Sequence, residues 1–156
     1  MLILLDIDGV MVQAASWKAV EILDDGFTSF NARAVSGLQR IISETNASIV
    51  LTTSHKSKYN LAQWQEIFKK RGITATINKL DDNKNYLTRK EEIINWANDN
   101  KHSNQFVIID DDKSLNGLPN NLKEKLIQTS AMIGLNDEDT SKAITILKSY
   151  EAVIAY

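Results

Sequence analysis

The sequence predicts an α/β fold in which a parallel sheet of about five strands carries helices on both faces. Three short apolar segments show no alternation of polar and apolar residues, which is typical of strands that are covered on both sides. Segments with helical spacing of apolar residues separate them. Strands that alternate with helices are joined by right-handed crossovers, and the result is a doubly wound, Rossmann-like sheet.

The sequence predicts three clear strands and two weaker ones. The first lies within Met1–Leu5, and the other two clear strands are Ala47–Thr53 and Gln105–Asp110, which are rich in β-branched residues. Thr74–Ile77 and Leu126–Thr129 are weaker candidates for the fourth and fifth strands. Each of the three clear strands ends in polar residues.

Four helices are predicted between and after the strands. Apolar residues spaced three or four apart, together with end signals, mark them: Val35, Leu38, Ile41 and Ile42 after an Asn31 cap; Leu61, Trp64, Ile67 and Phe68 before Gly72; Ile93, Ile94 and Ala97; and a last helix from about Asp139 to Tyr150.

The segment from Val10 to Phe30 interrupts the alternation of strands and helices. Residues 19–23 and 27–30 flank Asp24-Asp25-Gly26, which predicts a small hairpin standing over the end of the first strand. We find no repeat, low-complexity segment or linker, so residues 1–156 are expected to form a single domain.

The composition and charge of the chain exclude several kinds of functional site. A chain of 156 residues with 43% hydrophobic residues can bury a substantial core, and the absence of cysteine excludes disulfides and thiolate metal sites. The net charge of −2 gives no global reason to bind nucleic acid, although a local basic surface is compatible with it. Met1–Leu5 is too short for a secretory signal and no apolar stretch is long enough to span a bilayer, so we expect no membrane contact and a cytoplasmic location.

Polar groups stand at the ends of the three clear strands: Asp6 and Asp8, Thr52 and Thr53, and Asp110–Asp112. Ligands of doubly wound sheets bind at the carboxyl ends of the strands. So many carboxylates in one crevice repel each other unless a cation is present, and an all-oxygen donor set favours Mg²⁺. A cation there attracts a phosphoryl group, whose oxygens the threonine hydroxyls can bind.

These motifs resemble those of the haloacid-dehalogenase-like (HAD) phosphohydrolase superfamily. The family's first motif corresponds to Asp6-Ile7-Asp8-Gly9, its second to residues 49–53, and its fourth to residues 107–112. Its third motif is a Lys or Arg about twenty residues before the last acids, where Arg89-Lys90 stands, and either residue fits. The resemblance covers nearly the whole chain.

The resemblance implies covalent phosphoryl transfer. Asp6 would attack phosphorus to form an aspartyl phosphate, and Asp8 would act as general acid and then general base. Thr52 and either Arg89 or Lys90 would complete the catalytic set, while Gly9, Thr53 and Ser54 would bind the substrate.

The resemblance also implies the ligands of Mg²⁺. These are Asp6, the main-chain carbonyl of Asp8, and one of the last acids. Asp111 is preferred among the last acids, but the register leaves Asp110 and Asp112 open.

Neither gap between the motifs has room for a large cap domain. An open site implies a phosphorylated substrate that is itself large, such as an RNA or DNA end or a phosphoprotein, or a partner subunit that acts as the lid. Four stretches further resemble the HAD domain of predicted Swiss Army knife RNA-repair proteins, which would make the substrate a nucleic-acid terminus: residues 25–27, 52–55, 89–93 and 109–112.

Two other classes of function remain as alternatives. A receiver-like phosphoryl switch also gathers acids, a Thr and a Lys on a doubly wound sheet, but it carries its phosphoacceptor Asp at a middle strand, whereas here the second strand ends in Thr52-Thr53. A catalytically silent module that binds Mg²⁺ or nucleic acid is the other alternative.

Several further residues carry simpler interpretations. Asp24-Asp25 predicts a solvated turn, Lys69-Lys70-Arg71 a solvated helix end, and Trp64 a core residue. His55 is interpreted as a loop residue, with contact to a substrate phosphate as the alternative. Lys56, Lys58 and Lys113 are candidates to flank the cleft, and Trp17 is a candidate to stack on a base.

Overall fold

The five-stranded parallel sheet is confirmed by the computed structural model, which describes residues 1–14, 19–100 and 105–154. The strand order is β3-β2-β1-β4-β5 and every pairing is parallel. No large cap domain occurs within the described ranges. The strands are β1 (Leu2–Leu5), β2 (Ser48–Leu51), β3 (Ile77–Lys79), β4 (Phe106–Asp110) and β5 (Leu126–Gln128).

The four predicted helices are present, and a short fifth was not predicted. Asn31 caps the first as expected, because its side chain accepts hydrogen bonds from Arg33 N and Ala34 N. The helices are α1 (Ala32–Thr45), α2 (Leu61–Lys70), α3 (Arg89–Asp99), the unpredicted α4 (Asn120–Lys123) and α5 (Asp137–Ile154), with short 3₁₀ segments η1 (Lys56–Lys58) and η2 (Lys113–Gly117). No helix in the described part of the chain is long and apolar enough to cross a membrane.

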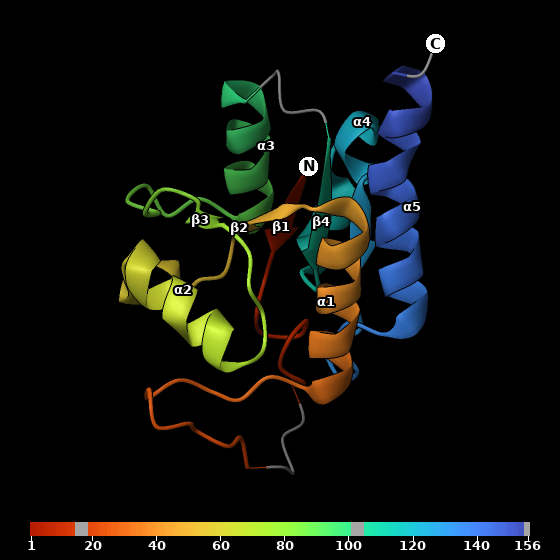
Figure 1. The fold of residues 1–156 in the computed structure, drawn as a ribbon. Coiled ribbons are helices and arrows are strands. Elements are labelled where there is room, and N and C mark those ends of the chain that lie inside the picture. Colours follow the sequence, from red (N-terminus) through yellow and green to blue (C-terminus); the bar gives the residue numbers. More distant parts are fainter. Residues whose placement is uncertain (15–18, 101–104, 155–156) are drawn as a thin grey trace.

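Helices cover both faces of the sheet (Figure 1). Ile3 and Leu5 of β1 pack into the core formed with α1, α2 and α5, whereas Leu4 packs into the core formed with α3 and α4. Successive residues of a strand point to opposite faces, so even-numbered positions of β1 face α3. Trp64 of α2 is fully buried, as predicted.

The register of the central strands sets the positions of the polar residues that follow. Leu5 of β1 pairs with Leu51 of β2 and with Ile109 of β4. The next residue on each strand is therefore in the same row: Asp6, Thr52 and Asp110. Because each follows an odd-numbered position that faces α1 and α2, all three are directed toward the α3 side at the carboxyl end of the sheet.

The fourth predicted strand lies later in the chain than Thr74–Ile77. Its ladder starts where Ile49 N donates to Thr76 O at 2.9 Å, and β3 then continues to Lys79. The residues before Thr76 are held by α2 instead, because the side-chain amide of Gln65 donates to Ala75 O. A side chain from another element has replaced the strand partner that the local pattern predicted.

The predicted hairpin between Val10 and Phe30 is a tight antiparallel turn. Ile22 and Thr28 form an antiparallel β-bridge across it, and Gly26 has a φ of +82° that allows the reversal. The segment passes beneath the carboxyl ends of the strands before α1 begins (Figure 1). Trp17 lies outside the described residues.

Candidate active site

Three carboxylates meet at the carboxyl end of the sheet. One oxygen from each of Asp6, Asp110 and Asp111 lies within 4.8 Å of the other two. Asp6 directly follows β1 and is 5% exposed, Asp110 ends β4 and is fully buried, and Asp111 is half-buried. Two neighbouring strands thus bring together acids that are about a hundred residues apart in the chain, as their positions at the strand ends predicted.

Gly9 provides the space in which the Asp111 side chain lies. A Cβ at position 9 would overlap the Asp111 carboxylate, and the φ of +81° is one that residues other than glycine rarely adopt. The Gly9 carbonyl accepts a hydrogen bond from Thr129 Oγ1 at 2.8 Å, which ties this turn to the end of β5. Gly9 therefore allows both the turn and the approach of the acid.

Arg89 is the cation that reaches the carboxylates. Its Nη1 lies 2.6 Å from Asp110 Oδ2 and 3.5 Å from Asp6 Oδ1. Arg89 is the first residue of α3, where the helix dipole disfavours a positive charge, so the acids account for its placement. The Lys90 ammonium lies instead beside Gly117.

A second ion pair, between Glu92 and Lys56, lies next to Arg89. Glu92, one turn further along α3, lies 2.9 Å from Lys56 Nζ and 3.9 Å from Arg89 Nε. The Lys56 side chain is only 4% exposed, so the prediction that it flanks the cleft is wrong. No local pattern indicates this pair, because the two residues are 36 positions apart in the chain.

The electrostatics of the cluster favour a bound cation. Burial and the negative charge of Asp110 raise the pKa of Asp6 to about 8, against the partial opposition of Arg89. Burial likewise raises the pKa of Asp110, although Arg89 partly offsets it. A divalent cation among these oxygens would favour their ionised forms, and the all-oxygen donor set suits Mg²⁺.

Thr52 contributes a buried hydroxyl to the same row as Asp6. Its Oγ1 has no hydrogen-bond partner among the described residues, although the residue is fully buried. An unpaired buried hydroxyl costs about 1–3 kcal/mol, so such a group is a candidate to bind a ligand oxygen. Thr53, by contrast, accepts a hydrogen bond from His55 N at 3.2 Å, and Ser54 is exposed.

Asp112 lies next to the cluster but its carboxylate has another partner. Its Oδ1 accepts a hydrogen bond from Ser114 N at 2.9 Å and caps η2. Its main-chain N–H donates to Asp110 Oδ1 at 3.0 Å, which fixes the Asp110 carboxylate in turn.

Asp8 stands at the exposed rim of the site. Its side chain is 60% exposed, and its Oδ2 lies 2.8 Å from His55 Nε2. The sequence interpretation of His55 was a loop residue, with contact to a substrate phosphate as the alternative, and it did not include a bond to Asp8. The only signal for this contact was the position of His55 three residues after Thr52, in the turn that follows β2.

The turn at Asp24-Asp25 and the end of α2 are joined by a buried ion pair. Arg71 Nη1 lies 2.6 Å from Asp25 Oδ2, and the Arg71 side chain is only 2% exposed. The interpretations of Asp25 as part of a solvated turn and of Arg71 as part of a solvated helix end are therefore wrong. Lys70, also at that end, pairs with Asp24.

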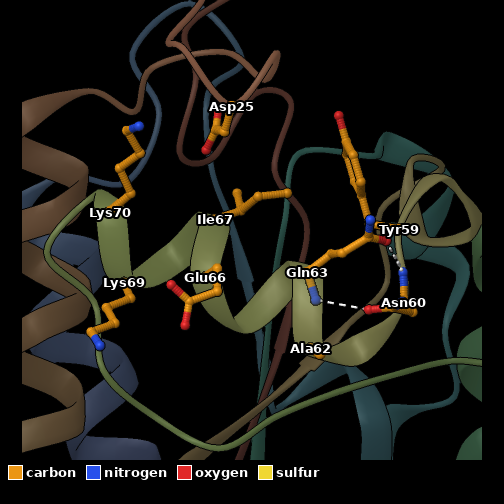
Figure 2. A pocket seen from close by; sticks show the side chains of 9 residues that line it. All are labelled: Asp25, Tyr59, Asn60, Ala62, Gln63, Glu66, Ile67, Lys69 and Lys70. Atoms are coloured by element: carbon orange, nitrogen blue, oxygen red, sulfur yellow. Dashed lines mark hydrogen bonds between the residues drawn. The ribbon is translucent and has the colours of Figure 1, made fainter.

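A hollow lies between this turn and α2, where Figure 2 shows Asp25 facing Ile67 and Lys70 of the helix. Asn60 and Gln63, which also line the hollow, cap the start of α2. No member of the carboxylate cluster lines it, and its charges are of both signs. The hollow is thus separate from the candidate active site.

One family model matches most of the chain. Residues 2–140 match the HAD domain in Swiss Army Knife RNA repair proteins. No curated protein and no solved structure matches the chain. HAD domains act as phosphohydrolases on phosphorylated substrates and generally use Mg²⁺, which agrees with the acidic cluster at the sheet edge. Because the match covers most of the sequence, the chain belongs to the family of HAD domains of Swiss Army Knife RNA repair proteins.

Proposed function

We propose that the chain is a magnesium-dependent phosphatase that acts through an aspartyl phosphate on Asp6. The observation that carries this proposal is the convergence of Asp6, Asp110 and Asp111 with Arg89 at the carboxyl end of the sheet. A phosphoryl group bound there meets a nucleophilic carboxylate and a guanidinium at once.

In the first step, an Asp6 carboxylate oxygen attacks phosphorus, the ester P–O bond breaks, and Asp8 donates a proton to the leaving oxygen. In the second step, water attacks the phosphorus of the aspartyl phosphate and gives a proton to Asp8. The Asp6–phosphorus bond then breaks and inorganic phosphate leaves. The exposed position of Asp8 supports this role, because a proton carrier must reach both the leaving group and water.

Asp6, Asp111 and the main-chain carbonyl of Asp8 would hold Mg²⁺. Asp110 is bonded to Arg89 and Asp112 caps η2, so Asp111 is the preferred ligand among the last acids. When bound, the cation would neutralise charge on Asp6 and on the phosphoryl oxygens.

The phosphoryl oxygens would be bound by the Thr52 hydroxyl and the Arg89 guanidinium, with Thr53, Ser54 and the main chain around Gly9 as further contacts. The support for Thr52 is its unpartnered, buried Oγ1 in the same row as Asp6. Arg89 rather than Lys90 takes the role of the phosphate-binding cation, because only Arg89 is seen to reach Asp6 and Asp110.

The proposed substrate is a nucleic-acid end. Two observations favour it over a small metabolite: the described residues form no large cap over the site, and the family description names RNA repair proteins. A phosphoprotein would also fit an open site, and the assay below separates the two.

The test is phosphate release from 3′- and 5′-phosphorylated oligonucleotides, free nucleotides, sugar phosphates and phosphopeptides, with and without Mg²⁺. We expect release from an oligonucleotide end, its loss when EDTA is added, and its loss in Asp6→Asn. Asp137→Asn, at the start of α5 and outside the carboxylate cluster, is the matched control and should retain activity. Undiminished release by Asp6→Asn or without divalent metal would contradict the mechanism, and activity confined to sugar phosphates would contradict the substrate.

Three further measurements separate the candidate Mg²⁺ ligands and the alternative functions. Calorimetric titration with Mg²⁺ should show affinity weakened by about tenfold or more in Asp111→Asn and little changed in Asp112→Asn. A phosphorylated Asp6 that persists after treatment with acetyl phosphate would favour a receiver-like switch instead. RNA binding without turnover of any phosphorylated end would favour a silent binding module.

A further inference from the structure

His55 and Asp8 form a hydrogen-bonded pair at the rim of the site. His55 Nε2 lies 2.8 Å from Asp8 Oδ2, and the two side chains are 30% and 60% exposed. An exposed carboxylate without a partner samples several rotamers in water. This contact engages Oδ2, one of the two carboxylate oxygens of Asp8.

The imidazole of His55 is itself held in place by the hairpin. Its ring meets the ring of Phe27 edge-on, with centroids 5.7 Å apart and planes at 82°. Phe27 is only 5% exposed, packs on Trp64 at 5.4 Å, and lies under the Arg71 guanidinium at 5.6 Å. The buried core beneath the hairpin therefore fixes the ring that contacts Asp8.

The backbone of His55 is fixed by hydrogen bonds within its own turn. Its N–H donates to Thr53 Oγ1 at 3.2 Å, and its carbonyl accepts from Lys58 N at 2.9 Å. Both contacts belong to the turn that follows β2, which also carries Thr52. The turn after β2 and the hairpin thus determine together where the imidazole lies.

We propose that His55 is a positioning residue that orients the Asp8 carboxylate toward the leaving oxygen, with Phe27 as its support. The inference rests on the proposed function, in which Asp8 protonates that oxygen. The His55 bond to Oδ2 places the transferable proton on Oδ1. His55 should therefore matter most for substrates whose leaving group needs a proton, and little for those whose leaving group departs as a stable anion.

The experiment compares phenyl phosphate with 4-nitrophenyl phosphate, which differ little in size while 4-nitrophenol is the more acidic leaving group. The readout is kcat/KM, because it reports the steps up to release of the leaving group and excludes the hydrolysis common to both substrates. We expect His55→Leu to lower kcat/KM for phenyl phosphate by about tenfold or more and for 4-nitrophenyl phosphate by about threefold or less. His55→Gln, which keeps an amide donor near Nε2, should recover most of the loss.

A double variant tests whether His55 acts through Asp8. Asp8→Asn alone should show the same dependence on leaving group, and adding His55→Leu should cause no further loss, because the two residues act as one unit. Equal losses on both substrates, or independent losses in the double variant, would overturn the proposal and indicate a phosphate contact or a purely structural role. Urea unfolding of each variant identifies a loss that comes from destabilisation.

Histidine NMR supplies a readout that needs no turnover. The chain has two histidines, so the imidazole ¹⁵N resonances can be assigned to His55 and His102. Asp8→Asn should shift those of His55; no shift at His55 would overturn the contact itself. If Asp8→Asn leaves kcat/KM intact on both substrates, the proposed function fails; if Asp8→Asn is impaired and His55→Leu is not, only the present inference fails.

Discussion

Replacing Arg71 by methionine removes the buried cation that joins the hairpin to the end of α2. The Arg71 guanidinium donates to both Asp25 carboxylate oxygens, at 2.6 and 3.0 Å, and to three main-chain carbonyls. The three carbonyls are those of Phe27, Thr28 and Ile67, at 2.8 to 3.0 Å. Methionine keeps an apolar stem of similar length but has no donor, so all five acceptors lose this partner.

The expected cost follows from burial. Breaking a buried ion pair by removing one partner costs about 3–5 kcal/mol. The Asp25 side chain is 21% exposed, so water recovers part of its solvation and the lower end of that range applies. We therefore expect Arg71→Met to lower the free energy of unfolding by about 3 kcal/mol, out of a total of about 5–15 kcal/mol for a domain. Arg71→Lys, which keeps the charge but not the two-pronged geometry, should fall between wild type and Arg71→Met.

Equilibrium unfolding in urea measures this difference. Lys69→Met is the matched control, since Lys69 is an exposed cation two residues earlier on the same helix, and it should change stability by no more than about 0.5 kcal/mol. If Arg71→Met and Lys69→Met were equally mild, Arg71 would be a solvated helix end and the structural reasoning would be refuted. Because Phe27 lies under the Arg71 guanidinium, Arg71→Met should also weaken the support of His55.

Three other perturbations give equally specific outcomes. The paired guanidinium lowers the pKa of Asp25 from its usual value of about 3.8, so this group stabilises the fold fully above that value and loses its contribution as the pH falls through the lowered value. The stability gap between wild type and Asp25→Asn should therefore begin to narrow below about pH 4 and narrow further at lower pH in urea titrations, and a constant gap would contradict the pairing. Gly9→Ala places a methyl group against the Asp111 carboxylate and should weaken Mg²⁺ binding by about tenfold in calorimetry; unchanged affinity would argue against Asp111 as a ligand. Glu92→Gln leaves the Lys56 ammonium buried without its carboxylate, so it should lower the free energy of unfolding in urea by about 3 kcal/mol. The double variant Lys56→Met, Glu92→Leu should recover part of that loss, and a double variant less stable than Glu92→Gln would count against the buried pair.

The sequence alone was sufficient to predict the sheet and the row of polar residues at its edge. Unbroken apolar segments identify strands that are buried on both faces, and parallel strands bring their carboxyl ends to one edge. The convergence of Asp6, Thr52 and Asp110 on adjacent strands follows from these two facts. Local patterns carry this information because the strand period and the chain direction determine which residues share an edge.

The partners of individual side chains were decided only by the tertiary structure. Arg89 and Lys90 are equivalent in the sequence pattern, but successive helix residues point about 100° apart, and only the packing of α3 on the sheet directs Arg89 to the acids. The pairs of Arg71 with Asp25 and of His55 with Asp8 join residues 46 and 47 positions apart, across a turn that no periodicity describes. A local pattern reports the burial of a face but not the residue on another element that faces it, and for that reason the supports of the site became visible only in the folded chain.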